Sequence, residues 1–115
     1  MPMNQRIKGL WIDALLSGEF VQGRYSLRGD ANERCCLGVL CEVHSKQTGK
    51  KWKGRKYLKQ DGALSNYVLA WAGLDTGSAY ACCVPIPPRR EMTLARLNDN
   101  GKTFAEIAAI IKEHL

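Results

Sequence analysis

The sequence has little of what most enzymes and membrane proteins display. No apolar run approaches the roughly 20 residues that a membrane-spanning helix needs, and the first residues lack the apolar core of a secretory signal. Only two histidines, His44 and His114, occur among the 115 residues. The acidic residues show neither paired carboxylates nor a metal-ligand spacing, and no glycine-rich phosphate loop occurs. We therefore expect a cytoplasmic, non-enzymatic protein without a cofactor and without a membrane partner.

Cysteine is plentiful, but its arrangement does not suggest disulfides or a metal site. Five is an odd number, and the adjacent pairs Cys35-Cys36 and Cys82-Cys83 do not suggest a disulfide framework. Structural zinc sites usually contain two cysteines two residues apart, and this spacing does not occur here. The alternative is a metal site that uses Cys41 and His44, one helical turn apart. We expect five reduced, metal-free, structural thiols with raised pKa values.

Length and composition predict one domain over residues 1–115. A hydrophobic content of 45% and a charged content of 24% are ordinary for a soluble globular protein, and this length suffices for a hydrophobic core. The densest apolar stretch covers residues 33–43, and its apolar side chains follow the spacing of one helical face: Cys36, Val39, Leu40 and Val43. This stretch predicts a central helix over residues 33–48.

Caps, periodicity and turn residues predict the other elements. Helices are expected over residues 4–17, 64–71, 93–98 and 103–115, and the last begins with a capping box. Residues 20–28 alternate loosely and predict a short strand or an extended arm, and residues 79–86, rich in strand-forming side chains, predict a short strand. Together these elements predict an α+β fold, with four to five helices around the central cysteine-rich helix and a small antiparallel sheet.

The positive charge is concentrated in one segment. Residues 44–60 contain no acidic residue and seven basic ones: Lys46, Lys50, Lys51, Lys53, Arg55, Lys56 and Lys59. The chain has 17 basic and 11 acidic residues. Outside this segment, ten basic residues and eleven acidic ones almost cancel, so the segment accounts for the whole net charge of +6. Trp52 and Tyr57 lie among these charges. The alternative is a solvating loop or edge strand over residues 46–59, with both rings folded back onto the core.

Cations interleaved with aromatic rings are typical of surfaces that bind phosphates and bases together. Lysine and arginine would neutralise phosphates, and a ring would stack on a base. Arginines from the extended arm 20–28 and from the pair after the second strand are expected to contribute. The candidate ligand-binding residues are Lys50, Lys51, Trp52, Lys53, Arg55, Lys56, Tyr57, Arg24, Arg28, Arg89 and Arg90. No catalytic residue and no metal ligand is predicted.

Four stretches of the sequence resemble a family of small phage and prophage proteins of unknown function. They are Trp11…Leu15-x-x-Gly18…Gln22…Leu27, Cys35-Cys36-Leu37-Gly38-Val39-Leu40-Cys41, Trp71-Ala72-Gly73-Leu74 and Leu97-Asn98-Asp99-x-Gly101-x-x-Phe104-x-x-Ile107-Ala108. The Cys-Cys-Leu-Gly-Val-Leu-Cys motif is the most specific of them. The resemblance implies a small accessory viral protein that counters a bacterial defence system, and it carries no catalytic residue over to this chain.

Three functions are compatible with these observations. The first is the binding and sequestration of an anionic nucleotide-type ligand, such as a defence signalling nucleotide. The second is nucleic-acid binding by the same residues, and the third is inhibition of a host defence protein or complex through protein–protein contact. The sequence leaves the oligomeric state open, with a homo-oligomer among the alternatives.

Overall fold

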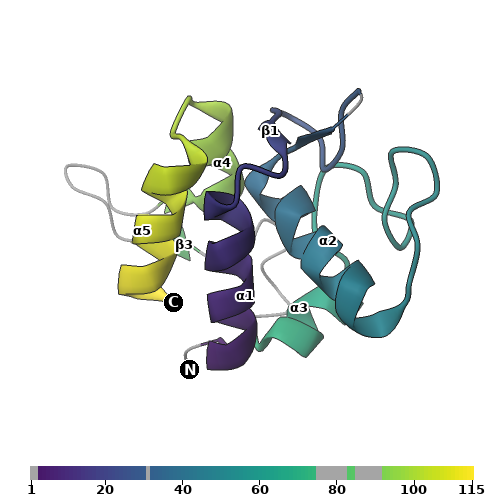
Figure 1. The fold of residues 1–115 in the computed structure, drawn as a ribbon, viewed down its shortest axis with the longest axis horizontal. Helices are drawn as coiled ribbons and strands as arrows, with labels where there is room; N and C mark the ends of the chain where they lie inside the picture. Colours follow the sequence, from purple (N-terminus) through teal and green to yellow (C-terminus); the bar gives the residue numbers. More distant parts are fainter. Residues whose placement is uncertain (1–2, 31, 75–82, 85–91) are drawn as a thin grey trace.

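Helices make up most of the computed structural model, which describes residues 3–30, 32–74, 83–84 and 92–115. The three long helices are α1 (Gln5–Leu16), α2 (Cys36–Thr48) and α5 (Phe104–His114), and the two short ones are α3 (Asn66–Ala72) and α4 (Leu94–Asp99). Figure 1 shows α5, α1 and α2 next to one another, with α4 beside the start of α5. In the described part of the chain, no helix is both long and apolar enough to cross a membrane.

The helices begin and end where the sequence places their caps. Four predicted N-caps each accept a backbone N–H from the first turn of their helix: Asn4, Ser65, Thr93 and Thr103. Thr103 and Glu106 form the predicted capping box. Gly49 ends α2 with φ at 79°, in the left-handed region that glycine adopts without steric cost. The local signals in the sequence therefore fix most helix boundaries.

The predicted central helix is confirmed, although it begins at Cys36 and not at residue 33. Every residue from Cys36 to Cys41 is buried. The helices α1 and α4 pack against α2, and Trp11 of α1 donates a hydrogen bond to the Cys36 carbonyl at 2.9 Å. The expected start is wrong because Glu33–Arg34 form a strand. Cys35 is the N-cap instead, and its Sγ accepts the N–H of Gly38 at 3.4 Å.

The extended arm forms a parallel pair of strands, which corrects the antiparallel sheet expected from the sequence. β1 (Val21–Gln22) pairs with β2 (Glu33–Arg34), with Val21 opposite Glu33. Between the two strands, Leu27 is buried against α2. Its carbonyl accepts the N–H of Cys35 at 3.3 Å, and its N–H donates to the Asp61 carbonyl at 2.6 Å. The chain therefore passes beside α2 before it returns in the same direction as β1.

A second pair of short strands lies near the C-terminal helices. β3 (Cys83–Val84) pairs with β4 (Met92–Thr93), and this pair is antiparallel. The remainder of the predicted strand 79–86 lies outside the described residues. The fold is thus α+β and mostly helical, as the sequence predicts.

Candidate functional site

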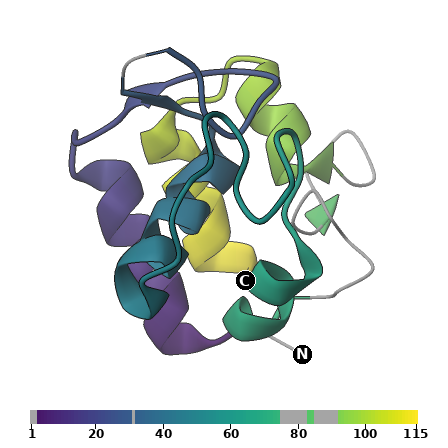
Figure 2. The same ribbon diagram turned by 90° about the vertical axis from the view of Figure 1, so that its right-hand side faces the viewer.

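The basic segment leaves the end of α2 as a projecting loop. We call residues 50–60 the basic lobe. It extends beyond α2 on the side away from α1 (Figure 1), and Figure 2 shows it running across the molecule as two successive loops between α2 and α3. Lys53 and Lys56 exchange backbone hydrogen bonds of 2.9 and 3.1 Å, and Tyr57 and Gln60 exchange bonds of 2.8 and 3.0 Å. Two consecutive tight turns therefore shape the lobe.

Three hydrogen bonds that involve side chains attach the lobe to the rest of the fold. At its start, the Ser45 hydroxyl donates to the Lys50 carbonyl at 2.5 Å. At its tip, Arg28 Nη1 donates to the Gly54 carbonyl at 3.0 Å. At its inner edge, the Tyr57 hydroxyl bonds to His44 Nδ1 at 2.5 Å. The lobe is therefore preorganised by contacts to both α2 and the extended arm.

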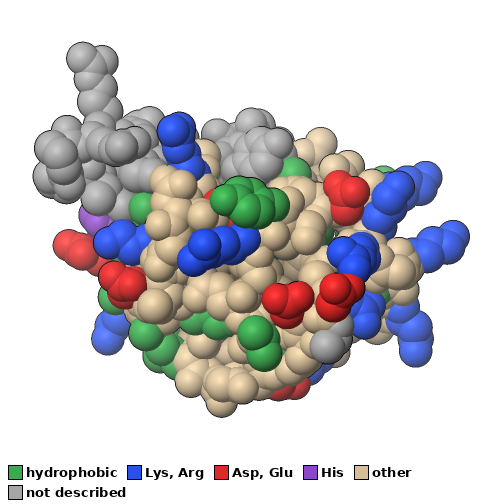
Figure 3. Space-filling model, turned by 90° about the horizontal axis from the view of Figure 1, so that it is seen from above, with side chains coloured by type: hydrophobic (Ala, Val, Ile, Leu, Met, Phe, Trp, Pro, Cys, Tyr) green, Lys and Arg blue, Asp and Glu red, His purple; other side chains and the backbone are tan. Residues whose placement is uncertain are grey.

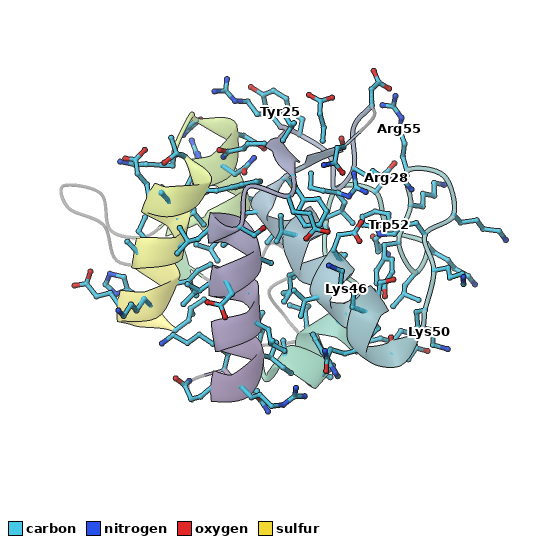
Figure 4. All side chains as sticks on the ribbon, in the orientation of Figure 1. Tyr25, Arg28, Lys46, Lys50, Trp52 and Arg55 are labelled. Atoms are coloured by element: carbon cyan, nitrogen blue, oxygen red, sulfur yellow. The ribbon has the colours of Figure 1, made fainter. Side chains whose placement is uncertain are left out.

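The two aromatic rings of the segment are already used by the fold. Tyr57 is only 1% exposed, so its ring is not available to stack on a base as the sequence analysis expected. Trp52 is half-buried, and its ring centroid lies 5.6 Å from Cζ of Arg28 and 5.4 Å from Cζ of Arg34, distances typical of cation–π contacts (Figure 4). For these two rings, the alternative interpretation describes the structure.

The lysines of the lobe, by contrast, point to solvent. Within the whole basic segment, Lys46 pairs with Glu19 at 3.3 Å and Arg55 pairs with Asp30. Over the ranges that the structure describes, five exposed lysines have no carboxylate partner: Lys50, Lys51, Lys53, Lys56 and Lys59. Figure 3 shows Lys and Arg side chains gathered at the edge of the molecule where the lobe lies. The lobe is therefore a surface of uncompensated positive charge.

The structure brings only some of the remaining predicted residues to the lobe. Arg28 contacts it through Gly54 and Trp52. The Arg24 guanidinium lies instead beside Gly101, in the turn between α4 and α5. Arg89 and Arg90 lie outside the described residues. The candidate site therefore consists of the lobe itself with Arg28.

A cavity of about 310 Å³ opens next to the lobe, and the sequence analysis did not anticipate it. It is lined by His44, Thr48, Lys50, Leu58 and Tyr67. Tyr67 lies on α3 and is 78% exposed, whereas the neighbouring Val68 and Leu69 are buried. In the sequence, Tyr67 lies outside the apolar face of the predicted helix 64–71, and this position could have indicated an exposed ring.

The His44 ring is engaged by the fold through one of its two nitrogens. Burial, and then the charge of Lys50, lower the pKa of His44, which favours the neutral ring. Burial raises the pKa of Tyr57 to about 12, so the Tyr57 hydroxyl keeps its proton. His44 Nδ1 and the Tyr57 hydroxyl share a hydrogen bond of 2.5 Å, and Nε2 makes no hydrogen bond to any part of the chain that the structure describes.

Two other cavities lie away from the basic lobe. One of about 260 Å³ lies between α1 and α2, and three carboxylates line it: Asp13, Glu19 and Glu42. Another of about 460 Å³ lies beside Tyr25 and α4, and both Asp99 and Arg96 line it. Neither contains a residue of the basic lobe. The cavity beside Lys50 is therefore the one of the three that a ligand bound to the lobe would reach.

The cysteines at the start of α2 and within it are buried. Burial raises the pKa of Cys35 to about 11 and raises the pKa values of Cys36 and Cys41 well above the usual thiol range. Within residues 3–30, 32–74, 83–84 and 92–115, no group of three or more potential metal ligands occurs. His44, the partner considered for Cys41, bonds to Tyr57 instead.

These thiols are expected to resist alkylation until the protein unfolds, because the reactive thiolate is disfavoured by burial. Trypsin releases Cys35, Cys36 and Cys41 together on the peptide 35–46, separate from the peptide 60–89 that holds Cys82 and Cys83. Iodoacetamide treatment at pH 8 followed by mass spectrometry should find peptide 35–46 unmodified in native protein and fully modified in denaturant. Rapid modification of this peptide in native protein would show that the thiols are accessible.

The fold and the site define a small, mostly helical α+β domain with a preorganised cationic lobe. The chain belongs to a family of unknown function: the family model described as "Domain of unknown function (DUF8296)" matches residues 3–115. A search of the curated proteins found no match, and a search of the solved structures found none either.

Proposed function

We propose that the protein binds and sequesters a small anionic ligand of the nucleotide type, and that the basic lobe holds the phosphates of this ligand. The observation that carries the proposal is the set of five exposed, unpaired lysines on one anchored loop. Lysine ammonium groups act as point charges toward phosphate. Because the loop is fixed before binding, little conformational entropy is lost when the ligand binds.

The pairing of Lys53 with Lys56 supports an anion between them. These residues lie directly opposite one another in the first tight turn of the lobe, and like charges placed opposite one another destabilise such a pair. No carboxylate of the described chain offsets this repulsion. A bound phosphate would do so, and its binding would thereby stabilise the turn.

The proposal is for binding without chemistry, in the cytoplasm of a phage-infected cell. The histidine nearest to the lobe, His44, is engaged by Tyr57, and no carboxylate in the described chain contacts it. The resemblance to phage and prophage proteins favours a counter-defence role, in which the ligand is a defence signalling nucleotide and sequestration interrupts the signal. Sequestration requires that the ligand be recovered chemically unchanged from denatured protein.

A charge-reversal pair tests the role of the lobe. The variant Lys53→Glu/Lys56→Glu keeps like charges opposite one another, so its stability should match that of the wild type, but it replaces attraction for phosphate by repulsion. We expect the affinity for ATP and for cyclic dinucleotides, measured by isothermal titration calorimetry at low salt, to fall by at least about tenfold. The matched control is Arg96→Glu/Lys112→Glu, which changes the net charge equally but lies on α4 and α5.

Equal losses in the two variants would mean that only net charge matters, and unchanged affinity in the lobe variant would refute the proposed site. Two further outcomes would favour the other function classes. Affinity that grows with oligonucleotide length and falls steeply with salt would indicate nucleic-acid binding, because each neutralised phosphate releases a counterion. Co-purification of a host defence protein, without binding of any nucleotide, would indicate a protein–protein inhibitor.

A further inference from the structure

We propose that the cavity beside the basic lobe is a ring-binding site, which takes one nucleobase-like heteroaromatic ring of the ligand and stacks it on Tyr67. This inference rests on the proposed function for the phosphates and adds a second, separate contact for the ring. It replaces Trp52 and Tyr57 as the stacking residues, because the fold already uses both of their rings.

The electrostatics of the cavity favour a neutral group over a phosphate. Its inner wall is the last part of α2, between His44 and Thr48, and the carbonyl end of a helix carries a partial negative charge. The His44 side chain next to this end is neutral and so contributes no positive charge. The phosphates of a ligand would therefore bind at the lysines of the lobe, and the cavity suits its uncharged ring.

The shape and apolar character of the cavity suit a single ring system. Its volume of about 310 Å³ is at the small end of the range for ligand pockets. The half-buried Leu58 and the phenol ring of Tyr67 supply apolar surface. Large aromatic side chains usually bury most of their area, yet Tyr67 is 78% exposed at the edge of this cavity. A planar ligand ring would cover it.

Few polar groups in the cavity are left to a ligand. The Thr48 hydroxyl donates to the His44 carbonyl at 2.7 Å and accepts the Lys50 N–H at 3.3 Å. Nε2 of His44 is the ring nitrogen that the described part of the chain leaves free, and it suits a hydrogen bond to the edge of a base. Lys50 lines the cavity and also begins the lobe, so it connects the ring site to the phosphate site.

Binding of two triphosphate ligands, one with a ring and one without, tests the ring site independently of the phosphate site. ATP carries a ring and inorganic triphosphate does not, and GTP, CTP and UTP extend the test to the other bases. We expect Tyr67→Ala to weaken the best-bound nucleotide by about tenfold or more, as base–aromatic stacking predicts, and to leave triphosphate affinity unchanged. Tyr67→Phe should retain wild-type affinity. The control is Tyr25→Ala, because Tyr25 is 77% exposed and lies on the side of the molecule away from Lys50 (Figure 4).

The outcomes distinguish this inference from the proposed function. If Tyr67→Ala binds every nucleotide as the wild type does, while Lys53→Glu/Lys56→Glu loses both nucleotides and triphosphate, the ring site is refuted and the phosphate site stands. If the wild type binds triphosphate as tightly as every nucleotide, the ring makes no contact and the ring site is again refuted. If the wild type binds neither nucleotides nor triphosphate, both proposals fail.

Discussion

The variant Gly38→Ala is expected to lower the stability of the fold strongly, although alanine normally favours a helix. A methyl group at Gly38 would lie 2.9 Å from the carbonyl carbon of Leu27 and closer still to its oxygen. Both are backbone atoms, so a side-chain rotation cannot relieve the overlap. The arm at Leu27 would have to move away from α2 and give up its hydrogen bonds to Cys35 and Asp61. We expect a loss of about 3 kcal/mol or more in the free energy of unfolding.

The matched control is Gly9→Ala in α1, where an added methyl group would meet no atom within 4 Å. This substitution should stabilise the protein by about 0.5–1 kcal/mol, because alanine is the better helix former. Urea denaturation followed by circular dichroism measures both variants. Similar stability of Gly38→Ala and the wild type would mean that the extended arm does not lie against α2 as described.

Asn98→Ala is expected to have the second largest effect, because the fully buried Asn98 amide connects four elements. Its Oδ1 accepts the N–H of Cys36 at 3.1 Å and Nε2–H of Gln22 at 2.9 Å, and its Nδ2 donates to the carbonyl of Gly23 at 2.8 Å. Gln22 in turn accepts the N–H of Phe104, the first residue of α5. Each buried group left without a partner costs about 1–3 kcal/mol.

We therefore expect Asn98→Ala to lower the free energy of unfolding by about 3 kcal/mol, in the same denaturation assay. Asn100→Ala is the control, since Asn100 is exposed at the end of the same helix and surface substitutions usually change stability by less than about 0.5 kcal/mol. Equal effects of the two substitutions would contradict the role assigned to the buried amide.

The parts of the fold that depend on local signals could be predicted from the sequence. Asn4, Ser65, Thr93 and Thr103 each combine a side-chain acceptor with an apolar periodic stretch, and each caps a helix. The central position of α2 followed from its wide apolar surface, which other elements must cover. These features require only neighbouring residues, so one sequence is enough to read them.

The start of α2 and the pairing of the strands depend on partners far along the chain. Glu33 and Arg34 fit a helical pattern, but Val21 and Gln22 pair with them as a strand. The N–H of Cys36 is satisfied by Asn98, 62 residues away. Gly38 is required because Leu27 approaches α2 so closely. Periodicity contains no information about any of these contacts.

The positive charge of the candidate site could be predicted from the sequence, but the aromatic residue that is exposed there could not. Lysines on a loop between two helices are exposed almost whatever the path of the loop. The direction of a ring, however, depends on the turn: Leu58 and Lys59 adopt positive φ values of 49° and 72°, and Tyr57 at the start of this turn points inward to His44. The exposed ring, Tyr67, belongs to the next helix and lies outside the basic segment.

The most direct test of the central claim is an NMR titration of the ¹⁵N- and ¹³C-labelled protein with ATP, with inorganic triphosphate as the second ligand, in which ¹H–¹⁵N spectra report the backbone amides and ¹H–¹³C spectra report the aromatic rings. The account predicts that ATP shifts the backbone amides of residues 50–60 together with the side-chain signals of His44 and Tyr67. Triphosphate should shift the amides of the lobe and leave the Tyr67 ring unaffected. Shifts confined to the α1–α2 groove or to the surroundings of Tyr25, or no shifts with either ligand, would contradict the account.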